Sequence, residues 1–400
     1  MLQRHNLLLR LSTASARTRS ARPPLRIPAS VCAYARSMST ARTCSPTLTS
    51  TSRIETTTPR RPFSVSPSTH AISADPASEL ASTSAASPDD SSAPSLVSTS
   101  WLADNLSRVV PIDATWYLNP VSDKNKVGMD DEWAFIPAQG VKKAASVKDA
   151  RKEYSERHIE GSRFFDLDEV SDHLSTLPHM LPSLEEFEEH VSAMGITEND
   201  HVVVYDTHGI FSAPRVWWTF KVFGHKNVSV LDGGLPKWLS EGRPVVSTLE
   251  SHPKSQYKGE FHESMVIDYQ AMLVHVTDFM FSKNFSIIDA RPRDRFAGFA
   301  PEPRPTLSSG HVPSSINIPA SELVDPRTKT MLPRKDILRR LFIENVDLDR
   351  PIVTMCGSGV TAATLFLALD IVGKRGDVKL FDGSWTEWAS KSKSPIKKWT

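Results

Sequence analysis

Cysteine is scarce in this chain of 400 residues, which contains 3. Two of them, Cys32 and Cys44, lie in an N-terminal segment that we expect to be removed. Cys356 is then the single thiol of the remaining chain, which excludes an internal disulfide and any cysteine-based metal cluster. A lone thiol in a reducing compartment is either an inert core residue or a reactive group.

Long apolar runs are also missing. No stretch of about 18 apolar residues occurs, so we expect no transmembrane helix. The formal net charge is +1, from 47 basic and 46 acidic residues. Because no overall field of one sign exists, we expect neither nucleic acid nor an anionic membrane as a partner.

Lysine and acidic residues are nearly absent from the first 70 residues. This segment holds eleven arginines, no lysine and a single acid, Glu55. An arginine- and serine-rich, acid-poor start is typical of a transit peptide, and we expect residues 1–63 to direct the chain to the mitochondrial matrix. A disordered basic tail is the alternative, and initiation at Met38 would give a cytosolic form.

Residues 64–97 are rich in Ser, Ala and Pro and contain few aromatic side chains. Such a segment cannot bury enough apolar surface to offset its conformational entropy. We therefore predict a disordered linker here, followed by the part of the chain that folds.

The folding part contains an internal repeat at an offset of 150 residues. HVVVYD at 201–206 matches PIVTMC at 351–356, and the DGG that follows in the first copy matches a DGS in the second. Asp206 thus stands where the second copy has Cys356. We predict two duplicated domains, at 98–247 and 265–400, joined by a linker at 248–264.

Short β-branched runs alternate with longer amphipathic stretches in both copies. Strands are predicted at 109–113, 201–205, 228–231, 285–289, 351–355 and 377–381, and helices at 183–194, 334–345 and 360–373. This alternation is typical of α/β domains in which a parallel sheet carries helices on both faces. Active sites of such sheets lie beyond the carboxyl ends of the strands, where the sequence places Cys356.

The stretch PIVTMCGSGVTAATLF around Cys356 allows three interpretations. A phosphate-binding loop is disfavoured, because no lysine follows the glycines. A packed cysteine at the strand end remains open. A nucleophile is favoured, because Gly357 and Gly359 let backbone N–H groups turn toward the sulfur and a helix start faces it. The duplication supports this choice, since Asp206 shows that the fold needs no cysteine at this position.

The tandem repeat, the loop C-G-S-G-V-T-A and the ending D-G-G/S-x-x-x-W resemble the two-domain rhodanese family of sulfurtransferases, and within it the members that act on 3-mercaptopyruvate. The resemblance covers about residues 98–400. It implies a catalytic second domain, a first domain without catalytic cysteine, and a persulfide on Cys356. It also implies a loop backbone around the sulfur that is formed by Gly357, Gly359, Val360 and Thr361. No metal or organic cofactor is implied.

The segment DARPRDRFAGFAPEPR (289–304) resembles the substrate-binding stretch of this family. The resemblance assigns substrate binding to Arg295 and Arg304, whose planar guanidinium groups suit a carboxylate beside a carbonyl. Arg291 and Arg293 are expected to form ordinary surface ion pairs.

The mercaptopyruvate-specific members also join the loop serine to a His and an Asp of the first domain. By this resemblance the relay is Ser358–His179–Asp168, which could protonate the departing enolate of pyruvate. His173 competes with His179, but P-H-M-L-P matches the family motif better.

The loop also distinguishes between donors. Relatives that prefer thiosulfate resemble C-R-K-G-V-T, whereas this chain has neutral Gly357 and Ser358 after the cysteine, which disfavours a doubly charged donor. We therefore expect sulfur transfer from 3-mercaptopyruvate to an acceptor thiol, such as thioredoxin or a small thiol, or to cyanide, by a monomer. A thiosulfate sulfurtransferase and a non-catalytic persulfide carrier are the alternatives. A phosphatase is disfavoured, because position 362 is alanine rather than arginine.

Overall fold

The computed structural model describes residues 93–118, 148–278, 280, 284–304 and 306–399. The predicted transit peptide, Cys32, Cys44 and most of the predicted linker 64–97 lie outside these residues. Within the described part, no helix is both long and apolar enough to cross a membrane.

The first repeat contains β1 (Leu96–Val97), α1 (Thr99–Asn105), η1 (Leu106–Arg108), β2 (Val109–Asp113), α2 (Ala150–Glu156), β3 (Arg163–Phe164), α3 (Leu184–Ala193), β4 (His201–Tyr205), α4 (Ala213–Val222), β5 (Val228–Leu231) and α5 (Gly234–Ser240). The second contains η2 (Glu263–Met265), β6 (Val266–Ile267), α6 (Tyr269–Thr277), β7 (Ser286–Asp289), α7 (Arg293–Ala297), β8 (Ile316–Asn317), η3 (Ala320–Leu323), α8 (Arg334–Ile343), β9 (Ile352–Met355), α9 (Ala362–Ile371), β10 (Val378–Phe381) and α10 (Ser384–Ser390).

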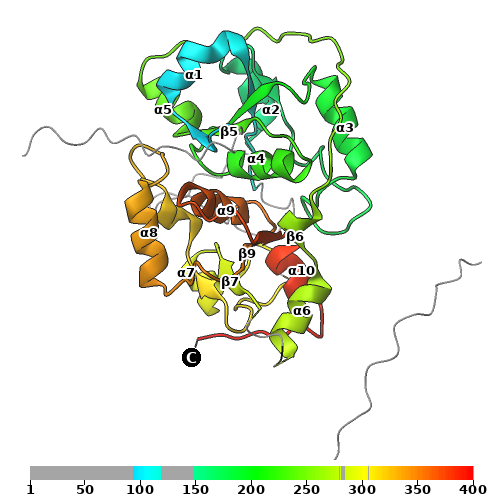
Figure 1. Ribbon diagram of the computed structural model, residues 1–400, viewed down its shortest axis with the longest axis vertical. Coiled ribbons are helices and arrows are strands. Elements are labelled where there is room, and N and C mark those ends of the chain that lie inside the picture. The colour runs from blue at the N-terminus through cyan, green and yellow to red at the C-terminus, as the bar shows by residue number, and fades with distance from the viewer. Residues whose placement is uncertain (1–92, 119–147, 279, 281–283, 305, 400) are drawn as a thin grey trace, which may run out of the picture. The chain divides into compact units, whose positions relative to one another are not determined.

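Each repeat forms one five-stranded parallel sheet (Figure 1). The strand order is β1-β5-β4-β2-β3 in the first sheet and β6-β10-β9-β7-β8 in the second. The two orders are the same when strands are matched by their place in the repeat. The predicted α/β class with two duplicated parallel sheets is therefore confirmed.

The longer strands agree with their predicted bounds to within one residue, and the predicted helix at 183–194 begins with a capping box between Ser183 and Glu186. The two-residue strands β1, β3, β6 and β8 were not predicted. β1 pairs with β5, and Ser95 donates to Asp370 at 2.5 Å. The prediction that the linker runs to residue 97 is therefore wrong at its end, because a two-residue strand gives no periodic pattern.

The alternation of side chains along β4 divides the core of the first repeat into two layers. Val203 and Tyr205 pack with α1 and α5 on one face. Val202 and Val204 face α3 and α4 on the other. The core of the second repeat is divided in the same way, with α6 and α10 on one face of the sheet and α8 and α9 on the other.

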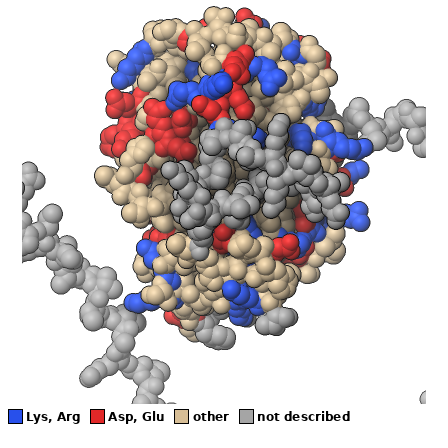
Figure 2. Space-filling model, turned by 180° about the vertical axis from the view of Figure 1, so that it is seen from behind, with Lys and Arg blue, Asp and Glu red and all other residues tan. Residues whose placement is uncertain are grey.

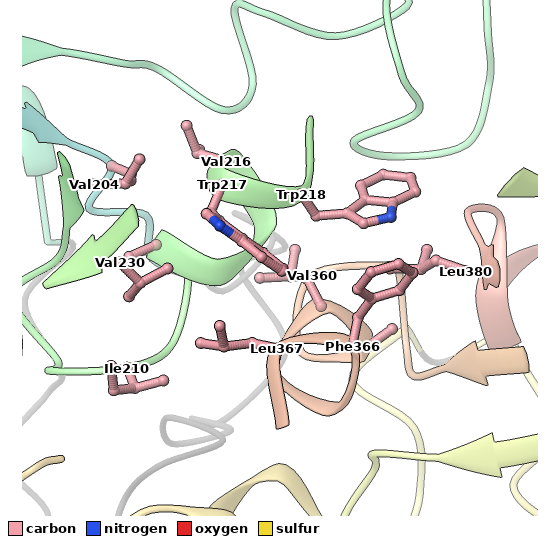
Figure 3. Close-up of a cluster of buried hydrophobic side chains, with 14 of the residues drawn as sticks. Val204, Ile210, Val216, Trp217, Trp218, Val230, Val360, Phe366, Leu367 and Leu380 are labelled. Atoms are coloured by element: carbon pink, nitrogen blue, oxygen red, sulfur yellow. The ribbon is translucent and has the colours of Figure 1, made fainter. Parts of the chain in front are cut away.

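The inner layers of both repeats merge into one hydrophobic core around α4 and α9 (Figure 3). The ring of Trp217 from α4 meets Phe366 from α9 edge-on, with centroids 6.1 Å apart. Both helices are buried on nearly all sides, as expected of helices that lie between two sheets. Because the loops after β4 and β9 lead directly into these helices, the shared core also fixes the loop that bears Cys356.

The predicted interdomain linker 248–264 has no regular structure before η2, yet part of it is anchored. Tyr257 is buried and packs against Phe187 of α3, with ring centroids 5.8 Å apart.

On the face shown in Figure 2, Lys and Arg side chains are interspersed with Asp and Glu.

Candidate active site

Cys356 directly follows β9, where the strand ends and the loop to α9 begins. It is 2% exposed and is the one cysteine among the described residues. Its backbone N–H donates to Oγ of Ser384 at 3.1 Å, and its carbonyl oxygen accepts from the N–H of Trp385 at 2.9 Å. These bonds fix the strand end against the start of α10. In the sequence Ser384 stands out only as part of the D-G-S motif, which does not indicate this contact with Cys356.

The equivalent loop of the first repeat shows what this loop geometry can hold. Asp206 is fully buried, and its carboxylate accepts hydrogen bonds of 2.8 to 2.9 Å from four backbone N–H groups. The donors are His208, Gly209, Phe211 and Ala213. A loop of this type therefore encloses a negatively charged group with backbone dipoles.

A small pocket lies above Cys356 and brings both predicted substrate-binding arginines to the thiol. It is lined by Trp116, Leu118, Arg295, Glu302, Pro303, Arg304, Cys356, Gly357, Ser358, Val360 and Thr361. Its volume is about 20 Å³, which holds little more than one water molecule. Gly359 does not line the pocket, but its φ of +82° turns the loop beneath it.

The charge around the pocket is organised by a buried carboxylate. Glu302 binds Arg291 at 2.7 Å and lies 4.0 Å from Arg295. Burial raises the pKa of Glu302, although the two arginines act in the other direction. Arg304 is half-buried and donates to Oγ1 of Thr386 at 3.3 Å.

The expectation that Arg291 forms a surface ion pair is wrong. It is fully buried, pairs with Asp289 at 2.7 Å and lies over the ring of Trp385. Arg293 is half-exposed and pairs with Glu322 and Glu344, as expected.

Two members of the predicted relay lie together. Nδ1 of His179 is 2.9 Å from Oδ1 of Asp168, and the His179 side chain is 4% exposed. Burial works against ionisation of Asp168, but the hydrogen bond and charge of His179 outweigh it and lower the pKa of this carboxyl. The competing residue His173 is exposed, and its ring nitrogen faces a backbone oxygen.

Trp116 connects this pair to the pocket, and sequence reasoning missed it. Its indole N–H donates to Oδ2 of Asp168 at 3.0 Å. Its ring meets that of His179 edge-on, with centroids 4.7 Å apart, and it also lines the pocket above Cys356.

Ser358, the third member of the predicted relay, is not hydrogen-bonded to His179. Ser358 lines the pocket and is 8% exposed. Among the described residues, however, neither ring nitrogen of His179 has a partner in full hydrogen-bond geometry, although Nδ1 lies 2.9 Å from Oδ1 of Asp168. The structure thus brings His179 to Asp168 and leaves the predicted link from His179 to Ser358 unformed.

Comparison with known proteins decides the family. The model of the rhodanese-like domain matches residues 139–241 and 275–391. The 3-mercaptopyruvate sulfurtransferase of Mus musculus is 38% identical over 296 residues, which cover 73% of this chain and 91% of that protein. The chain belongs to the rhodanese family.

The names of the relatives include both sulfur donors, 3-mercaptopyruvate and thiosulfate. The thiosulfate sulfurtransferase of Rattus norvegicus is also 38% identical, over 73% of this chain and 91% of its own length. The thiosulfate/3-mercaptopyruvate sulfurtransferase 1, mitochondrial, of Arabidopsis thaliana is 39% identical over 75% of this chain and 77% of its own. Identity alone therefore does not choose the donor.

Two solved structures share the rhodanese fold. The Tum1 protein of Saccharomyces cerevisiae is 32% identical, with a TM-score of 0.65 over 76% of this chain and 98% of its own. SseA of Escherichia coli, described as a 3-mercaptopyruvate sulfotransferase, is 32% identical, with a TM-score of 0.60 over 73% of this chain and 98% of its own.

Proposed function

We propose that this member of the rhodanese family transfers sulfur from 3-mercaptopyruvate to an acceptor thiol through a persulfide on Cys356. The observation that carries the proposal is the composition of the pocket. One buried thiol lies beneath Arg295 and Arg304, in a loop whose next two residues, Gly357 and Ser358, are uncharged.

In the first half-reaction the thiolate of Cys356 attacks the sulfur of the donor. A sulfur–sulfur bond forms, the carbon–sulfur bond breaks, and its electron pair leaves on carbon as the enolate of pyruvate. The loop around Cys356 suits the anionic persulfide that remains, because the equivalent loop holds the carboxylate of Asp206 by four backbone N–H groups.

Arg295 and Arg304 bind the carboxylate and the carbonyl of the donor. Their guanidinium groups are planar forks that match these acceptors. Glu302 lies 4.0 Å from Arg295 and helps to hold it on the pocket wall.

His179, Asp168 and Ser358 supply the proton that the enolate needs. Asp168 holds the imidazole of His179 from one side, as carboxylates do in other acid–base pairs. Ser358, on the pocket wall, is the group through which the proton reaches the product. Binding of the donor brings Ser358 and His179 into hydrogen-bond distance, since such bonds often tighten only in the substrate complex.

In the second half-reaction an acceptor thiolate attacks the outer sulfur and releases the thiolate of Cys356. A reduced thioredoxin or a small thiol fits this role, and cyanide replaces it in an assay. Because the two half-reactions share one covalent intermediate, the kinetics are ping-pong.

The donor is tested by adding the charges that this loop lacks. We expect Gly357→Arg with Ser358→Lys to lower kcat/KM for 3-mercaptopyruvate and raise it for thiosulfate by about ten-fold or more, because two cations favour a doubly charged donor. A Cβ at position 357 meets nothing closer than 4.0 Å, so the backbone accepts the change. Steady-state assays with both donors measure the shift, and Arg293→Lys, away from the pocket, is the control.

An unchanged preference in the double variant refutes the charge argument. If the unaltered protein has the higher kcat/KM for thiosulfate, it is a thiosulfate sulfurtransferase. If it turns over neither donor, it is a persulfide carrier.

We propose further that residues 1–63 direct import into mitochondria. Their composition supports this, and the Arabidopsis relative is named mitochondrial. N-terminal sequencing of the protein from isolated mitochondria tests it, and an intact Met1 there contradicts it.

A further inference from the structure

A buried arginine joins the two repeats beside the loop that bears the thiol. Arg215, at the start of α4, is 1% exposed and pairs with Oδ1 of Asp382 at 2.5 Å. Its guanidinium also contacts two backbone oxygens, that of Gly359 at 3.4 Å and that of His179. The other oxygen of Asp382 accepts from the N–H of Leu181 at 2.8 Å. One side chain therefore connects the loop of the second repeat to the segment that carries His179.

The same interface occurs a second time, at the offset of 150 residues, next to Asp206. Asp232 there corresponds to Asp382, and its Oδ1 accepts from the N–H of Met331 at 2.8 Å. Met331 corresponds to Leu181. The backbone contact between the repeats is thus built twice, once beside the thiol and once beside Asp206.

The two copies of this interface differ in their side chains. Lys329 stands where the other copy has His179, and both have a left-handed backbone, with φ of 62° and 59°. Thr364, which is fully buried, holds the place of Arg215, since each is the third residue of its helix. The arginine is thus present only beside the thiol, so the backbone contact forms without it.

We propose that Arg215 is a positioning residue that holds His179 against the Cys356 loop and so sets the rate at which the proton reaches the product. It does not line the pocket above Cys356. The inference rests on the proposed function in one respect, namely that His179 belongs to the proton relay.

The contacts of Arg215 give the physical reason. The left-handed backbone forms in both copies, so Arg215 is not needed to form it. Its bonds to the carbonyl oxygens of His179 and Gly359 instead fix where this segment lies against the Cys356 loop. The planar fork of Arg215 donates from two separate nitrogens, Nη1 toward Asp382 and Gly359 and Nη2 toward His179, a spread that a single ammonium nitrogen does not match. A Cβ at position 359 would lie 2.7 Å from Nη1 of Arg215, so Gly359 is also needed to admit the guanidinium.

The test is a double-mutant cycle on the full chain, with 3-mercaptopyruvate as donor. Arg215→Leu removes the guanidinium, and His179→Asn removes the imidazole. We expect Arg215→Leu alone to lower kcat by about ten- to a hundred-fold with little change in KM, because a small displacement of His179 is enough. In the His179→Asn background the same change should cause no further loss, because the two residues act as one unit.

Asp232→Asn is the matched control, because it weakens the same backbone contact on the other side. We expect it to leave kcat unchanged. If Arg215→Leu does not fold, Arg215→Lys, which keeps the charge beside Asp382, is judged by the same criteria. Losses that multiply in the double variant, or an equal loss of kcat in Asp232→Asn, overturn the proposal.

Amide hydrogen exchange separates this inference from the proposed donor, because it needs no turnover. Peptides that cover residues 177–182 should exchange faster in Arg215→Leu and not in Asp232→Asn. Failure of the unaltered protein to form a persulfide refutes the proposed function alone. Unchanged exchange at 177–182 in Arg215→Leu refutes the positioning role alone.

Discussion

Trp116 contributes to the candidate active site in three ways. It forms part of the pocket wall above Cys356, packs edge-on against His179 and donates its indole N–H to Asp168. The carboxylate of Asp168 is thus held at both oxygens. A carboxylate held in this way orients the imidazole better than one with a single partner.

We expect Trp116→Phe to lower kcat for 3-mercaptopyruvate by about ten-fold, since it removes one hydrogen bond to a charged group and keeps the aromatic packing. Steady-state kinetics measure it. Trp101→Phe, where the indole packs against His201 away from the pocket, is the control. Equal effects of the two substitutions would contradict a specific role for the indole N–H.

Single residues were predictable where a local pattern or the family resemblance marked them. Cys356, Arg295 and Arg304 follow recognisable loops, and the structure places all three at one pocket. Trp116 and Arg215 were missed, because each acts through partners far away in the sequence, such as Asp382 at a separation of 167 residues. No pattern within one segment encodes such a pairing.

At the scale of elements, β2 and β7 both end in a buried aspartate, but the two side chains have different partners. Asp113 ends β2 and accepts from the N–H and hydroxyl of Thr115, at 2.9 and 2.5 Å. Asp289 ends β7 and pairs with Arg291. Without an arginine beside it, Asp113 has its pKa raised by burial to about 7.

This difference predicts a pH dependence of stability. Between about pH 4 and pH 7 the folded chain keeps a proton on Asp113 that the unfolded chain has released. The free energy of unfolding therefore falls as the pH rises through this range. We expect Asp113→Asn to remove this contribution, so that the stability of the variant relative to the unaltered protein increases from pH 4 to pH 8. Urea unfolding at several pH values measures it, and a constant difference would contradict the assignment.

The longer strands were predicted well because each is a β-branched run that is buried on both faces. The edge strands β1, β3, β6 and β8 were not, since each has two residues and forms by pairing with a neighbour. For these, the register of the adjacent strand decides the structure, and the local sequence does not.

At the scale of the whole molecule, the duplication explains why the two described repeats share one core and why only one of the two equivalent loops carries a thiol. The two sheets enclose α4 and α9 between them, so neither repeat buries its inner layer alone. Only one copy of the loop carries a thiol, and the other carries Asp206. The sequence showed the repeat, but not that the repeats share their core, because the sequence pattern marks a buried face and not its partner.

We expect residues 265–400 produced alone to lack a cooperative unfolding transition, because α9 loses the packing of Trp217 and its neighbours. Near-ultraviolet circular dichroism during heating measures it, and addition of residues 93–264 should restore the transition. A cooperative transition of the isolated segment would show that the second repeat folds independently.

The central claim is that Cys356 carries the transferred sulfur, and the intact mass of the protein tests it most directly. After reaction with 3-mercaptopyruvate without acceptor, the mass should rise by one sulfur atom, and an added thiol should reverse the change. Cys356→Ser should keep its fold and show neither the increase nor turnover. An unchanged mass of the unaltered protein, or turnover by Cys356→Ser, would contradict the account.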